Sequence, residues 1–112
     1  SGNLLLGQDS LVYTVQNPNT SIEYLNNIYA ISKGENHSLF ATLDGYVYSL
    51  ENGELGQLGN GAYSNTEIPT LVKTEDGYLK NVLDISAGNK SSMAVTYDGK
   101  SYVWWGGRRW VN

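Results

Sequence analysis

The chain has 112 residues and a formal net charge of −4 at pH 7, from 11 Asp and Glu against 7 Lys and Arg. This balance argues against a nucleic-acid partner, because binding to the phosphate backbone depends on clustered Lys and Arg. The chain has no cysteine, which excludes disulfides and thiolate metal sites. It also has no apolar run near the roughly 20 residues of a membrane helix, so we expect no membrane insertion.

The beginning of the chain shares a pattern with a segment 54 positions further along. Gly2, Leu4 and Gly7 recur there as Gly56, Leu58 and Gly61. A fixed period of this size is typical of repeat proteins, whose units bury their faces against one another. We therefore interpret 1–21 as the outer strand and loop of a first repeat, equivalent to 55–75, with a strand at 11–15.

Residues 22–58 predict the core of one antiparallel sheet, with strands at 28–32, 38–42 and 46–50. Asp44-Gly45 marks the hairpin between the last two strands, and Asp-Gly favours a type I′ turn, which needs positive φ at its centre. Apolar residues stand consecutively at 39–41, as expected of a strand that is covered on both faces. No helical periodicity is sustained in the chain, so we expect no helix.

Residues 59–112 repeat this sheet, with strands expected at 82–86, 92–96 and 100–104 and a second Asp-Gly turn at 98–99. Small residues precede the glycines at 34 and 88, which would let strands converge around a crowded axis. We expect the last strand of this second sheet to be missing. The two sheets are expected to stack face to face.

The first copy resembles an RCC1-type repeat in its motifs. It carries, in order, Gly34, His37-Ser38, Thr-Leu-Asp-Gly at 42–45, Val-Tyr at 47–48 and Gly-Gln-Leu-Gly at 56–59. The second copy keeps many of these positions and Trp104, but has Ser91 in the place of His37. The resemblance implies a β-propeller, normally of seven blades. We therefore predict an all-β fold of two four-stranded antiparallel blades, a partial propeller without helix, and a fragment of a longer bacterial protein.

We assign structural roles to the repeated positions. These are Gly34, His37, Ser38, Asp44, Gly45, Gly56, Gly59, Gly88, Ser92, Asp98 and Gly99. His37 is the only histidine and has no partner at a catalytic spacing, so we expect it to bond the backbone or fill the seam between blades. The glycine-rich 56–61 lacks the Lys-Ser/Thr of a phosphate loop, and the carboxylates form no pair suited to glycoside hydrolysis. We predict no enzyme activity, cofactor or metal site.

The candidate interaction surface is the aromatic and basic segment near the end of the chain. It consists of Trp104, Trp105, Arg108, Arg109 and Trp110. Trp and Arg dominate binding hot spots, so this segment is a candidate contact surface. The alternative is that Trp104 packs inside its blade and the others pack on a neighbouring blade.

These observations favour a non-catalytic repeat scaffold for protein–protein interaction. The partner is expected to be another protein or a second copy, joined through exposed blade faces or strand edges. One alternative is carbohydrate or cell-wall binding through a Trp and Tyr surface. Another, implied by the resemblance, is guanine-nucleotide exchange or chromatin docking, which the acidic balance and the two-blade length oppose. Richness in Tyr, Asn and Gly favours a bacterial secreted or cell-surface protein.

Overall fold

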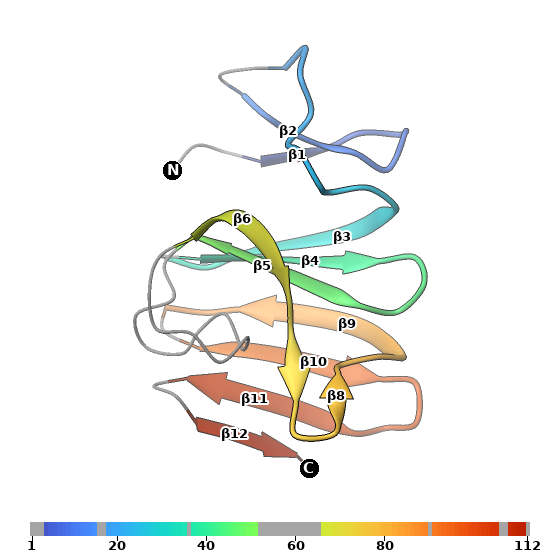
Figure 1. Cartoon of the computed structure of the whole chain (residues 1–112), viewed down its shortest axis with the longest axis vertical. Coiled ribbons are helices and arrows are strands. Elements are labelled where there is room, and N and C mark those ends of the chain that lie inside the picture. Colours follow the sequence, from blue (N-terminus) through green and yellow to red (C-terminus); the bar gives the residue numbers. More distant parts are fainter. Residues whose placement is uncertain are drawn as a thin grey trace.

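The computed structural model describes residues 4–15, 18–35, 37–51, 66–89, 91–105 and 108–111. Every regular element in these ranges is a β-strand, which confirms the predicted all-β fold. The strands form layers stacked along the longest axis of the molecule (Figure 1). No helix within the described ranges is long and apolar enough to cross a membrane.

The first blade is a four-stranded antiparallel sheet in the order β3-β4-β5-β6. Its strands are β3 (Ile28–Lys33), β4 (His37–Thr42), β5 (Val47–Glu51) and β6 (Thr66–Leu71). The predicted strands of this sheet agree with the observed bounds to within one residue. A small hairpin of β7 (Lys73–Thr74) and β8 (Gly77–Tyr78) then leads to the second blade.

The second blade repeats the first, in the order β12-β11-β10-β9. Its strands are β9 (Val82–Ala87), β10 (Ser92–Thr96), β11 (Ser101–Trp105) and β12 (Arg108–Val111). The expectation that the last strand would be missing differs from the structure, because β12 pairs antiparallel with β11 in that position. The connection before β12 is only 106–107, whereas 52–65 separates β5 from β6. The short connection hid the strand from the repeat alignment.

The Asp-Gly turns close hairpins as predicted, but the predicted type I′ geometry is wrong. Thr42 N donates to Tyr46 O at 2.9 Å, and Gly45 N donates to Thr42 O at 3.1 Å. Gly45 has a φ of +93°, whereas Asp44 is not among the residues with positive φ. This is the pattern of a type I turn followed by a left-handed glycine, which uses one more loop residue than a type I′ hairpin.

The N-terminal hairpin has the same turn. It consists of β1 (Leu4–Leu6) and β2 (Val12–Thr14), paired antiparallel. Gly7 N donates to Leu11 O at 2.9 Å and Ser10 N donates to Gly7 O at 3.0 Å, with Ser10 at φ 65°. These bonds align Gly7 with Thr42 and Ser10 with Gly45, whereas the repeated glycines and leucines predict an equivalence of 1–21 with 55–75.

The link from each hairpin to the next sheet supports this alignment. Ile28 N donates to Ser10 O at 3.0 Å, and Val82 N donates to Gly45 O at 3.0 Å. The hairpin of β1 and β2 therefore occupies the place of the second and third strands of a preceding blade. We call it the partial blade.

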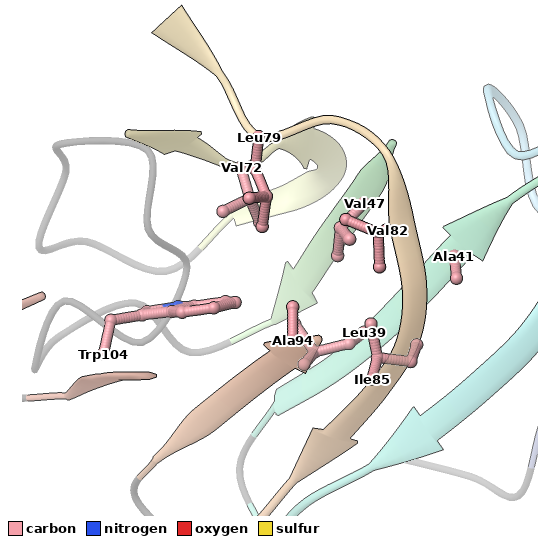
Figure 2. Close-up of a cluster of buried hydrophobic side chains, with 9 residues drawn as sticks. All are labelled: Leu39, Ala41, Val47, Val72, Leu79, Val82, Ile85, Ala94 and Trp104. Carbon is pink, nitrogen blue, oxygen red and sulfur yellow. The ribbon is translucent and has the colours of Figure 1, made fainter. Parts of the chain in front are cut away.

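Two hydrophobic clusters hold the layers together, and they occupy equivalent positions. Between the partial blade and the first blade lie Val12, Leu25, Ile28, Phe40 and Leu50. Between the two full blades lie Leu39, Ala41, Val47, Val72, Leu79, Val82, Ile85, Ala94 and Trp104 (Figure 2). Leu39 and Phe40 belong to different clusters because neighbouring side chains of β4 point to opposite faces. All of β4 is buried, which confirms that this strand is covered on both faces.

Candidate functional site

A buried hydrogen bond joins the two full blades across their seam. His37, on β4, is 1% exposed, and its Nε2 lies 2.8 Å from Ser92 Oγ on β10. The bond forms because these strands lie on facing sheets, each buried along its inner face. The lone histidine of the chain thus sits inside the blade seam, away from solvent.

Two further contacts cross the seam where the strands converge. Ala87 N donates to Ser32 Oγ at 2.8 Å. A Cβ at Gly34 would lie 2.2 Å from the carbonyl oxygen of Gly88, so this approach requires glycine. Small residues at this position therefore allow the blades to meet, as expected of a crowded axis.

Tyr29 bonds across the outer part of the seam. Its hydroxyl donates to the carbonyl oxygen of Leu83 on β9. Burial raises the pKa of Tyr29, because the charged phenolate would be poorly solvated there. Sequence reasoning missed this residue, since the second copy has Leu83 in its place and the repeat comparison carries no signal for it.

Ser38 occupies the position in the first blade that Ser92 occupies in the second. It is 0% exposed, and its hydroxyl has no hydrogen-bond partner among the described residues. Equivalent serines thus have different surroundings: one is bonded across a seam between full blades, and the other lies beneath the partial blade.

The turn aspartates have structural contacts. Thr42 Oγ1 donates to Asp44 Oδ1 at 2.5 Å, and Thr96 donates in the same way to Asp98. The bond from Thr96 lowers the pKa of Asp98, because it stabilises the ionised carboxylate. Gly56 and Gly59 lie outside the described residues.

The predicted aromatic and basic surface is only partly described. Trp104 is 2% exposed and lies in the cluster between the full blades, so it packs the seam (Figure 2). The side chains of Trp105, Arg108, Arg109 and Trp110 lie outside the described residues. Their backbone forms the β11–β12 pair, with Trp104 opposite Arg109. The buried Trp104 is therefore not part of an exposed contact surface.

Each end of the stack presents an apolar residue that has a buried counterpart within it. Met93 is 40% exposed, and its counterpart Leu39 is buried in the seam. At the other end Leu5 is 45% exposed, and the turn alignment places it at the position of buried Phe40. Over the described part of the chain, no group of three or more His, Asp or Glu side chains is placed to hold a metal ion.

Part of the chain matches a known family model. Residues 44–95 match the family model described as "Regulator of chromosome condensation (RCC1) repeat". The mouse E3 ubiquitin-protein ligase HERC2 is 30% identical over 105 residues, which cover 93% of this chain and 2% of the ligase. The chain therefore spans only a small part of that relative.

Solved structures show a similar fold. The structure of human WBSCR16 matches with a TM-score of 0.62 and 28% identity, covering 92% of this chain and 24% of that one. Prp20p from Saccharomyces cerevisiae matches with a TM-score of 0.72 and 20% identity, covering 94% of this chain and 32% of that one. Prp20p is a protein with binding properties to Gsp1p and histones.

Proposed function

We propose that this chain, which matches the RCC1 repeat family model over residues 44–95, is a non-catalytic scaffold that binds proteins through the end faces of its blade stack. The fold supports a protein-interaction scaffold in general, and the structural relative Prp20p binds protein partners. The finer proposal concerns the partner: another blade face, in the first instance that of a second copy of this chain.

The observation that carries the proposal is the exposure of Met93. In the first blade the equivalent Leu39 is buried against the second blade, together with Ala41. In the second blade Met93 is 40% exposed and Val95, at the position of Ala41, is only partly buried. The face of the second blade that carries Met93 is therefore apolar and exposed, and burying apolar surface of this kind favours association.

The opposite end offers a matching face. Leu4 packs toward the first blade, so Leu5 points the other way, at the position that Phe40 holds in the next layer. Stacking of a Met93 face on a Leu5 face would repeat the packing already seen within the chain. Such a contact joins different surfaces and is heterologous, so it extends into rings or chains of copies.

The test is light scattering after size exclusion over a concentration series. We expect the mass of the wild type to rise with concentration, and Met93→Lys to weaken association at least tenfold by placing a charge in the contact. Leu43→Lys is the matched control, because Leu43 is exposed at a hairpin tip away from both end faces. A wild type that stays monomeric up to millimolar concentration would overturn the self-association proposal, as would equal effects of the two substitutions.

The other functions have less support. Trp104 is buried and therefore cannot contribute to carbohydrate binding by the tryptophan segment. Chromatin docking is opposed by the net charge of −4, and nucleotide exchange is supported only by similarity to other proteins.

A further inference from the structure

We infer that a pocket on the first blade binds a neutral saccharide, at a site separate from the stack ends. The pocket has a volume of about 350 Å³, within the range of small-molecule sites. Its walls come from the β4–β5 turn, the start of β5, the end of β6, β8 and the segment before β3.

One wall is aromatic. Tyr46 directly precedes β5 and Tyr48 lies within it, and side chains two residues apart in extended chain point to the same face. Leu71 of β6 is paired opposite Tyr48 and continues this wall. Tyr78 of β8 adds a third ring, with Lys73 Nζ 5.3 Å from its centroid, a contact that restrains the ring.

The other wall is polar and is held in place by the fold. Tyr46 N donates to Thr42 Oγ1 at 2.8 Å, and Thr42 Oγ1 donates to Asp44 Oδ1 at 2.5 Å. Leu43 N donates to Asn27 O at 2.7 Å, which ties the segment before β3 to the turn. The Asp44 carboxylate and the backbone that carries Asn27 are therefore ordered before a ligand arrives, which reduces the entropic cost of binding.

The lining chemistry points to hydroxyl groups. Asn26 and Asn27 supply both donors and acceptors, and the Asp44 carboxylate only accepts. A sugar hydroxyl can pair with both donors and acceptors, because it donates and accepts hydrogen bonds. The apolar CH faces of a sugar ring can lie on tyrosine rings. None of the described lining residues is Lys or Arg, which disfavours an anionic ligand. A proline-rich peptide would lack the N–H donors that a carboxylate needs.

The second blade supplies an internal comparison. It keeps Asn81, Thr96, Asp98 and Tyr102 at four of the equivalent positions. It has Lys80 where the first blade has Asn26, and Lys100 where the first blade has Tyr46. The repeat therefore folds with lysine at both positions, so the fold itself does not demand Asn26 and Tyr46.

This comparison provides the test variant, Asn26→Lys with Tyr46→Lys. The probes are maltose, cellobiose and N,N′-diacetylchitobiose, measured by saturation-transfer NMR and calorimetry on the full chain. We expect at least one sugar to bind with a millimolar Kd, and the double variant to weaken it tenfold or more. Lys80→Ala with Lys100→Ala is the matched control and should bind like the wild type.

If the double variant is unfolded by circular dichroism, Tyr78→Ala takes its place, since that side chain is half exposed and its loss should also weaken binding tenfold. Failure of all three sugars to bind overturns the proposal, and so does unchanged binding by the folded variant. Binding of decaproline instead of sugar, lost in the same variant, would make the pocket a peptide site and equally overturn it.

Discussion

Replacing each of the two equivalent serines by alanine should destabilise the chain at Ser92 but not at Ser38. Ser92 Oγ lies 2.8 Å from the buried His37 Nε2, so Ser92→Ala removes a seam bond and leaves a buried ring nitrogen without that partner. Removing one hydrogen-bond partner from a buried polar group costs about 1–3 kcal/mol. Within the described part of the chain the Ser38 hydroxyl has no hydrogen-bond partner, and Ser38 is 0% exposed, so Ser38→Ala removes a hydroxyl that already carries a desolvation cost.

We therefore expect Ser92→Ala to lower the free energy of unfolding by about 2 kcal/mol, and Ser38→Ala to be neutral or to raise it by up to about 1 kcal/mol. For a small domain each kcal/mol shifts the Tm by roughly 4–8 °C. Urea unfolding followed by tryptophan fluorescence measures both variants, because Trp104 lies in the seam that Ser92 helps to close. The reasoning is refuted if Ser38→Ala costs as much as Ser92→Ala, or if adding Ser92→Ala to His37→Ala still costs its full amount.

Three further changes test the seam and the turns. Gly34→Ala should destabilise the chain by about 3 kcal/mol in urea unfolding, since its Cβ would lie 2.2 Å from Gly88 O. Gly99→Ala is the control, because a Cβ there would lie in open space and only the φ of +85° opposes it. It should cost about 1–2 kcal/mol. Burial raises the pKa of Tyr29, so the stability that its neutral hydroxyl contributes is present below the unfolded pKa of about 10 and is lost as pH rises through the folded value. In scans of Tm against pH, Tyr29→Phe should therefore reduce the loss of stability at alkaline pH. An unchanged profile would contradict this. The bond from Thr96 lowers the pKa of Asp98, so the stability that its carboxylate contributes is present above the unfolded pKa of about 3.9 and is lost as pH falls through the folded value. Asp98→Asn should therefore make stability depend less on pH between pH 2 and 5, as measured by urea midpoints.

The strands could be predicted because their signals are local. Consecutive apolar residues at 39–41 and paired Asp-Gly turns specify where each strand of a blade begins and ends. The turn type could not be predicted from Asp-Gly alone. Thr42 accepts the N–H of Tyr46 and donates to Asp44, and this side-chain closure accompanies a loop one residue longer than the motif predicts.

The partial blade shows why the alignment at the beginning of the chain differs between sequence and structure. The repeat comparison relies on matching glycines and leucines, whereas the hydrogen bonds align Gly7 with Thr42 and Ser10 with Gly45. Neither pair is identical in sequence. Ser10 takes a φ of 65° in the place of a glycine at 93°, so backbone conformation is shared where residue type is not.

For the candidate contact residues, residue type could be read from the sequence but placement could not. Trp is frequent in hot spots, which makes Trp104 a candidate binding residue, yet it fills the seam. Its counterpart Leu50 does the same in the other cluster, and that equivalence was readable from the repeat. The pocket lined by Tyr46, Tyr48 and Tyr78, here called the tyrosine pocket, could not be predicted because its walls come from segments that only the fold brings together.

The repeat also separates residues that make the fold from residues that make sites. Positions that both copies share, such as Asn27 and Asn81, have a role in the backbone. Each takes a positive φ, and each carbonyl accepts a hydrogen bond from the next turn. Positions that differ, such as Asn26 and Lys80, are not constrained in this way, because one backbone accommodates both residues. Folding does not require these differences between the copies, so the differing positions are where a specific ligand or partner should be sought. The tyrosine pocket combines differing positions with a rigid shared turn, which is the arrangement expected of a binding site mounted on a scaffold.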